Sequence, residues 1–218
     1  MNGPCPDTVT VLSVEKRRSV VQLVLSDESE RCVPAAVFLS LRLKEGQTVS
    51  RSGLDARIRA LTRNAAGNKA AALLSFRGRS VRETENALRR GGFDDESVEE
   101  TLASFQELGY LDDRTFTRDW IRSRLAKGIG PNRIRSELLL KGVDRTLVED
   151  ALSELDGGSA ADEALFRCLS KAVRGRNLDD PKERAKAIQQ IVRRGYSFSE
   201  ARAALDDYLK DNDPETMD

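Results

Sequence analysis

The sequence has no histidine, only three cysteines, a single tryptophan and no long hydrophobic run. Without histidine it lacks the side chain that most often acts as a general base or metal ligand near neutral pH. The cysteines, Cys5, Cys32 and Cys168, are odd in number and not at metal-ligand spacing, which favours reduced thiols. No segment approaches the roughly 18 apolar residues of a membrane helix, and the N-terminus lacks the pattern of a secretory signal.

These absences restrict the classes of function that the chain can have. No glycine-rich phosphate loop follows a strand, and no carboxylate stands in an apolar setting that would shift its pKa. We therefore expect a protein that is not an enzyme, with no catalytic residue, no metal, no cofactor and no membrane contact. The expected location is cytoplasmic, because free thiols persist in that compartment.

Charged residues make up 33% of the 218-residue sequence and sum to zero, but the two signs are sorted along the chain. Every charged residue from 93 to 113 is acidic, whereas basic residues dominate the charges from 114 to 145. A partner responds to the local field rather than to the net charge. The sorting predicts charged binding surfaces, and the overall balance is compatible with the monomer that we expect.

The first fifty residues have the alternation typical of strands. Residues 8–14 and 19–25 are rich in valine and threonine and flank a polar turn, which predicts a β-hairpin. A short third strand is expected at 31–33 and a strand remnant at 48–49. We predict a small β-rich N-terminal module over residues 1–55.

The rest of the chain has helical periodicity, and its helix signals recur at a fixed spacing. Ser80 and Glu83 form a predicted capping box, and glycine ends the helix that follows. The stop glycine Gly92 recurs at Gly142, 50 positions later, and at Gly195, a further 53 positions on. Such a period indicates a repeat array. The predicted fold is mainly α, a tandem array of three-helix repeats preceded by the β-rich module.

The predicted boundaries follow from these signals. The three-helix repeats are expected at 56–110, 111–156 and 160–210, with a frayed tail at 211–218. The linker Asp156-Gly157-Gly158-Ser159 has a flexible composition, which would let the third repeat move relative to the second.

One combination of motifs resembles a known family. The motifs are Gly109-Tyr110-Leu111-Asp112-Asp113, then Phe116, Trp120 and Arg124, then Gly128-Ile129-Gly130-Pro131, Ile134, Leu138, Gly142 and Val143. Over roughly residues 70–209 the chain is similar to the bacterial RecX regulatory family. The resemblance implies a negative regulator that lodges in the groove of the RecA–single-stranded-DNA filament. It further implies suppression of ATP hydrolysis, strand exchange and the co-protease activity that triggers the SOS response. The β-rich module is an extension whose role the resemblance does not imply.

Basic residues are the candidates for contact with a partner or with DNA. Arg114, Arg118 and Arg122 recur four residues apart and so line one side of a helix, where guanidinium groups suit phosphates or carboxylates. The alternative is a solvated face paired with the neighbouring acidic helices. The full predicted set comprises Arg82, Arg89, Arg90, Arg114, Arg118, Arg122, Arg124, Lys127, Arg133, Arg135, Lys141, Lys171, Arg174 and Arg176.

Aromatic and acidic residues offer weaker candidates. Trp120 could stack a nucleic-acid base, but its place beside Phe116 predicts a core residue. Tyr110 and Tyr196 are likewise expected to serve packing. The acidic run from 94 to 107 would mimic a nucleic-acid backbone or dock a basic patch, although acidic residues also favour helix N-termini.

Three hypotheses follow for function. The preferred one is a regulator that binds the RecA nucleoprotein filament, touching single-stranded DNA directly or through RecA. The second is an autonomous DNA-binding protein built from helix-turn-helix-like units, against which the zero net charge argues. The third is a scaffold whose β-rich module recruits another factor.

Overall fold

The computed structural model describes residues 7–154 and 159–212. The chain divides into two compact units, Met1–Asp112 and Asp113–Asp218, each described here by itself. Cys5, the predicted linker residues 156–158 and the end of the predicted tail lie outside the described residues. No described helix is long and apolar enough to cross a membrane.

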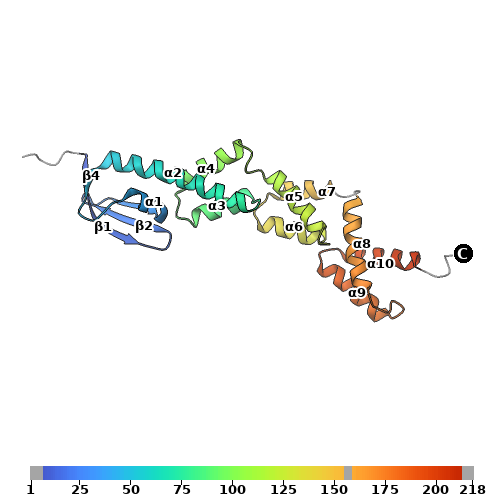
Figure 1. Ribbon diagram of the computed structural model, residues 1–218. Helices are drawn as coiled ribbons and strands as arrows, with labels where there is room; N and C mark the ends of the chain where they lie inside the picture. The colour runs from blue at the N-terminus through green and yellow to red at the C-terminus, as the bar shows by residue number, and fades with distance from the viewer. Residues whose placement is uncertain (1–6, 155–158, 213–218) are drawn as a thin grey trace, which may run out of the picture. The chain divides into compact units, whose positions relative to one another are not determined.

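The N-terminal unit begins with a four-stranded antiparallel sheet in the order β3-β2-β1-β4 (Figure 1). The strands are β1 Thr8–Lys16, β2 Val20–Leu25, β3 Glu30–Pro34 and β4 Thr48–Ser50, and α1 Ala35–Leu41 follows β3. Alternate residues of the strands, among them Val11, Leu23 and Val33, are fully buried because successive side chains point to opposite faces of a sheet. The predicted strands are confirmed.

A single long helix, α2 Arg51–Phe76, connects this sheet with the first repeat (Figure 1). Near its start, Leu54 packs in the core of the sheet, and further along Ala66 packs in the core of the first repeat. The predicted boundary between residues 55 and 56 therefore falls inside α2, and one helix serves both cores.

The first repeat is completed by α3 Val81–Arg89 and α4 Asp95–Glu107. The capping box of Ser80 and Glu83 is present as predicted, and Asp94 caps α4. Leu88, Val98 and neighbouring apolar side chains form the core. Tyr110 is 67% exposed, and its ring lies 5.9 Å from that of Phe105, which packs against this core.

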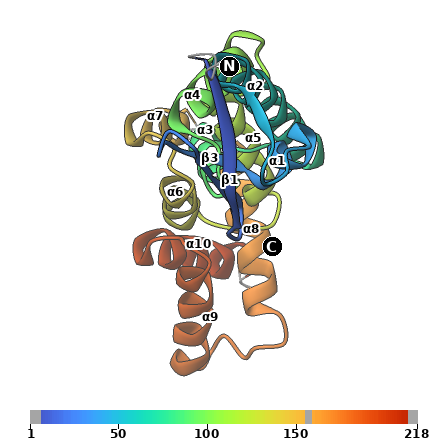
Figure 2. The same ribbon diagram turned by 90° about the vertical axis from the view of Figure 1, so that its left-hand side faces the viewer.

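The C-terminal unit contains the second and third repeats. The second consists of α5 Asp113–Leu125, α6 Pro131–Leu140 and α7 Arg145–Ser153. The third consists of α8 Ser159–Val173, α9 Pro181–Arg193 and α10 Phe198–Asp211, which pack against one another (Figure 2). Ile134 and Leu138 are fully buried in the second core, and Ile191 is fully buried in the third. The predicted repeat array with its β-rich module is thus confirmed as the fold.

The second and third repeats are joined directly through their backbones. The amide of Gly130 donates to the carbonyl oxygen of Arg194 at 2.8 Å, and the amide of Asn132 donates to that of Gly195 at 3.0 Å. A Cβ atom added at Gly130 would lie 2.5 Å from the carbonyl carbon of Gly195, which is closer than real Cβ contacts. Ala164 of α8 also packs in the core of the second repeat. Only glycine fits this junction.

Candidate functional site

A compact group of polar and aromatic side chains covers one face of α5 and α6. Glu137 lies at its centre: one carboxylate oxygen accepts hydrogen bonds from the Trp120 indole at 3.1 Å and from Arg124 at 2.6 Å, and Arg133 donates to the other oxygen at 3.4 Å. The cations of Arg124 and Lys141 each lie 4.1 Å from the Trp120 ring centroid. Two arginines therefore contact one carboxylate, and two cations lie over one indole ring.

Two kinds of contact hold Trp120 in this group, apolar packing and interaction with cations. It is partly buried against the core of the second repeat, as predicted for a core residue, and its ring attracts cations through its negative face. Because Arg124 and Lys141 already lie over the ring, a base cannot stack on those positions. Within this chain the ring contacts the cations of Arg124 and Lys141.

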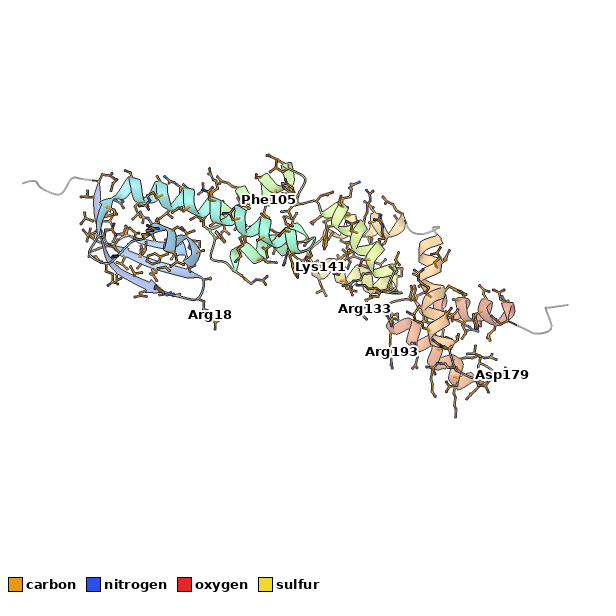
Figure 3. All side chains as sticks on the ribbon, viewed as in Figure 1. Arg18, Phe105, Arg133, Lys141, Asp179 and Arg193 are labelled. Carbon is orange, nitrogen blue, oxygen red and sulfur yellow. The ribbon has the colours of Figure 1, made fainter. Side chains whose placement is uncertain are left out.

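A second basic feature lies where α6 meets α9. An open cleft of about 540 Å³ is lined by five cationic side chains and two amides: Arg133, Arg176, Lys186, Gln189, Gln190, Arg193 and Arg194. No carboxylate of the described residues lines it. Figure 3 shows Lys141, Arg133 and Arg193 along the same side of the C-terminal unit. Arg133 belongs to both features, so we define the two together as the basic surface.

The charges within the cleft are only partly neutralised. Glu183 pairs with Arg176 at 2.7 Å and with Lys186 at 2.6 Å, and hydrogen bonds from Lys186 and Arg176 hold the pKa of this carboxyl below its usual range. Arg193 and Arg194 make no ion pair with any residue that the structure describes. The cleft therefore keeps an excess of positive charge and suits an anionic group with several oxygens, such as a phosphate.

The glycine junction holds the two sides of the cleft together. Arg133 follows Gly130 by three residues at the start of α6, and Arg193 and Arg194 directly precede Gly195 at the end of α9. The two hydrogen bonds of the junction fix these backbone segments against each other. Docking of the second repeat thus places Arg133 beside the six lining residues of the third repeat.

The predicted row of arginines on α5, Arg114, Arg118 and Arg122, does not line the cleft. Arg118 and Arg122 line a pocket with apolar side chains of α5 and α7 and with Arg167 of α8, and Arg118 pairs with Glu154 at 3.5 Å. Arg122 pairs with Asp119 at 3.5 Å. Successive positions on a helix are turned by 100°, so Arg124 points away from this row. The predicted basic cluster of α5 is therefore divided between two faces.

Other predicted residues do not line the cleft. Arg135 forms a hydrogen-bonded ion pair with Glu149 of α7 at 2.8 Å, which lowers the pKa of that carboxyl. Lys127 and Lys171 line a small pocket with Arg167 and Arg194. Arg114 and Arg174 are exposed.

The predicted arginines of the first repeat belong to the N-terminal unit. Arg82 pairs with Glu85 at 2.8 Å, and Arg89 pairs with Glu85 at 3.2 Å and Asp95 at 3.1 Å. Arg90 is exposed. Most of the positive charge of this helix is therefore compensated by carboxylates beside it.

Sequence reasoning missed three cations of the basic surface, Lys186, Arg193 and Arg194, and the two amides of the cleft, Gln189 and Gln190. The repeat alignment contains a signal for one of them, because Arg194 precedes the stop glycine Gly195 as Lys141 precedes Gly142. Only packing, which no local sequence signal reports, brings Arg193 and Arg194 beside Arg133 of α6. No group of three or more metal-ligating side chains occurs among the described residues.

The fold and this surface define a class, a tandem three-helix-repeat protein with a basic binding surface. Two family models match the chain: the RecX second three-helix domain at residues 112–152 and the RecX first three-helix domain at residues 66–105. The chain belongs to the RecX family of regulatory proteins, to which curated relatives and solved structures are also similar.

Among the relatives, the regulatory protein RecX of Prosthecochloris aestuarii is 37% identical over 65% of this chain and 92% of its own length. The regulatory protein RecX of Bacillus licheniformis is 35% identical over 66% of this chain, which spans only 56% of that relative. A crystal structure of regulatory protein RecX has a TM-score of 0.61 at 21% identity, covering 91% of this chain and 99% of that one. The structure of RecX from Lactobacillus salivarius, at 20% identity and a TM-score of 0.60, covers 68% of this chain and 97% of that one. Both solved structures support the fold.

Proposed function

We propose that this protein is a negative regulator of the RecA recombinase that binds the RecA filament on single-stranded DNA in its helical groove. Binding there inhibits ATP hydrolysis, strand exchange and the co-protease activity of the SOS response. The protein acts by binding, as a monomer in the cytoplasm, without chemistry of its own. Membership of the RecX family and the repeat fold support this proposal.

The basic surface is the observation that carries the proposal. Arg124, Arg133 and Lys141 on the second repeat continue into the cleft lined by Arg193 and Arg194 on the third. A filament presents regularly repeated phosphates and acidic protein surfaces, so cations spread over two docked repeats make several weak contacts that act together. The contacts of Arg133, Arg193 and Arg194 depend on ionic strength, because these three side chains are exposed.

The first test is RecA ATP hydrolysis on single-stranded DNA, titrated with the full chain. Inhibition well below one molecule per RecA protomer is expected for a filament regulator. The variant Arg133→Glu/Arg193→Glu/Arg194→Glu should require at least about tenfold more protein for half-inhibition, because it reverses the charge of the cleft.

The matched control changes the same amount of charge in the same C-terminal unit. Lys182→Glu/Arg202→Glu/Lys210→Glu alters three exposed cations that do not line the cleft, and it should inhibit like the wild type. Equal loss in both variants would mean that net charge, not this surface, matters. No inhibition by the folded wild type at any ratio would refute the proposal.

DNA binding in the absence of RecA separates the alternative function. An autonomous DNA-binding protein would bind single-stranded DNA tightly, with a salt dependence that weakens by about 0.7 in log–log slope for each phosphate contact removed. We expect weak binding by the free protein, because the positive cleft is small and the chain as a whole is neutral.

A further inference from the structure

A groove of the opposite character to the basic surface runs between α8 and α10 in the third repeat. It has a volume of about 740 Å³, and its apolar lining includes Leu165, Phe166, Ala204 and Tyr208. Phe166 is 58% exposed. Leu165, Ala204 and Tyr208 pack with one side against the core of the third repeat. The floor of the groove is therefore an apolar surface continuous with the core and open to solvent.

The rim of this groove is acidic. Its carboxylates are Asp162, Glu163, Glu200, Asp207 and Asp211, and Arg167 is the single cation in the lining. Glu163 pairs with Arg167 at 3.3 Å, and Asp207 pairs with Lys210 at 3.1 Å. No ion pair joins Asp162 or Asp211 to another residue that the structure describes. The rim therefore keeps a net negative charge beside the apolar floor.

The shape of the groove suits a helix. Its described lining residues come from α8 and α10 alone, and α9 packs against the same two helices without contributing to the lining. A further helix laid between α8 and α10 would complete a bundle, with its side chains in the groove between the two ridges. Such a helix presents apolar anchors at positions i, i+3 or i+4, and i+7 on one face.

We propose that this groove binds a cationic amphipathic helix of a partner protein. The anchors of that helix contact Phe166 and Tyr208, and its lysines or arginines lie beside Asp162 and Asp211. This site is distinct from the basic surface and does not depend on the function proposed for it. Charge complementarity selects the sign of the partner and speeds its association.

The same charge pattern disfavours other occupants. Phosphates of nucleic acids or anionic lipids would meet the carboxylates of the rim. A second copy related by two-fold symmetry would place the same acidic rim against itself, because such an interface uses the same patch on both chains. A basic helix from another protein avoids both conflicts.

The test uses the full chain and a synthetic helix as the probe. The probe is a fluorescein-labelled peptide of about 14 residues with leucine at the anchor positions and lysine elsewhere, a length at which an isolated helix is marginal and folds on binding. The control peptide has the same composition with its leucines spread around the helix. Fluorescence anisotropy should show at least about tenfold tighter binding of the amphipathic peptide, since only it offers an apolar face.

Variants then locate the site. Phe166→Ser should weaken binding of the amphipathic peptide by about tenfold or more, because it removes an aromatic anchor. The ring is exposed, so the helical circular dichroism should not change. Asp211→Lys should weaken binding several-fold at low salt. The matched reversal Asp206→Lys, on the same helix but outside the groove lining, should have little effect.

Three outcomes would overturn the proposal. Equal affinity for the two peptides would mean that only charge is recognised. Unchanged binding by folded Phe166→Ser would place the peptide elsewhere. A wild-type dimer in sedimentation that Phe166→Ser converts to a monomer would assign the groove to a second copy of the chain.

Discussion

The two units of this chain join their modules in different ways. In the N-terminal unit, one continuous helix, α2, packs Leu54 into the sheet core and Ala66 into the core of the first repeat. In the C-terminal unit, separate repeats meet at a backbone contact between Gly130 and Gly195. A shared helix distributes its packing over many side chains, whereas a backbone contact depends on a few atoms at close range. The second kind of joint is therefore the more sensitive to substitution.

The two units also differ in how they use arginine. Arg82 and Arg89 of the first repeat are paired with carboxylates on or next to their own helix. Arg193 and Arg194 of the third repeat make no ion pair with described residues and line an open cleft. Equivalent repeats share their caps, stop glycines and apolar positions, but their surfaces vary independently. In a repeat protein the shared fold determines where surface side chains lie, and the charges of those side chains determine what the surface binds.

The largest effect is expected when the glycine junction is broken. Gly130→Val should destabilise the C-terminal unit by about 3 kcal/mol, because the new side chain collides with the carbonyl group of Gly195 and no flexible atom can yield. Trp120 is the only tryptophan and lies in this unit, so its fluorescence during denaturation reports the change. A midpoint equal to that of the wild type would show that the junction tolerates a side chain.

The same variant tests the dependence of the basic surface on docking. If Gly130→Val separates the repeats, inhibition of RecA by the variant should fall even where both repeats remain helical. Retained inhibition in a variant with a weakened junction would mean that each repeat acts alone.

A smaller, stabilising effect is expected at Tyr196, beside the junction. Its side chain is buried, and its hydroxyl has no hydrogen-bond partner among the residues that the structure describes. Tyr196→Phe removes an unsatisfied buried polar group and should stabilise the C-terminal unit by about 1 kcal/mol. Chemical denaturation near neutral pH, followed by Trp120 fluorescence, measures the difference. A loss of stability would show that the hydroxyl is solvated or bonded.

The same substitution has a pH signature. Burial, together with the nearby charges of Cys168 and Glu200, raises the pKa of Tyr196 from 10.0 to about 12. The folded state thus favours the neutral phenol, and this contribution to stability is complete below pH 10.0 and is lost as pH rises toward 12. Tyr196→Phe should remove that part of the alkaline loss, which denaturation curves at several pH values would detect.

The smallest effect is expected in the shared helix of the N-terminal unit. Gly67 lies within α2, and a Cβ atom added there would have no heavy atom within 4 Å. Gly67→Ala should stabilise the N-terminal unit by roughly 0.5–1 kcal/mol, because alanine restricts the unfolded chain and favours the helix. Circular dichroism should record the gain while the Trp120 transition stays unchanged. A shift of the tryptophan transition would contradict independent unfolding of the two units.

Much of the fold could be predicted from local signals. Ser80 with Glu83, Asp94, and the stop glycine Gly92 mark helix ends through hydrogen bonds within a few residues of the chain. The buried positions follow the helical period, which is why Leu88 and Leu138 could be placed in their cores. By contrast, no local signal marks where the β-rich module ends and the first repeat begins, because this boundary lies inside α2. The helix is continuous there, since its start packs in the sheet core and its later residues pack in the core of the first repeat.

The candidate site was less predictable, and the α5 arginines show why. Arg118, Arg122 and Arg124 are close in sequence, and composition alone groups them into one basic cluster. The helix turns Arg124 toward Glu137 and Trp120, while Arg118 faces Glu154. Arg193 and Arg194, some sixty residues away from Arg133 in sequence, complete the cleft only because α9 docks beside α6. The order of charges along the chain does not reveal which residues distant in sequence lie close together in space.

The sequence by itself determined the helices, the repeat period and the RecX family, because caps, stop residues and apolar spacing act between near neighbours along the chain. Only the tertiary structure decided which cations share a surface, which are paired, and that an acidic apolar groove lies between α8 and α10. These properties depend on the packing of segments that are distant in sequence. Close packing, rather than local preference, sets the positions of those segments.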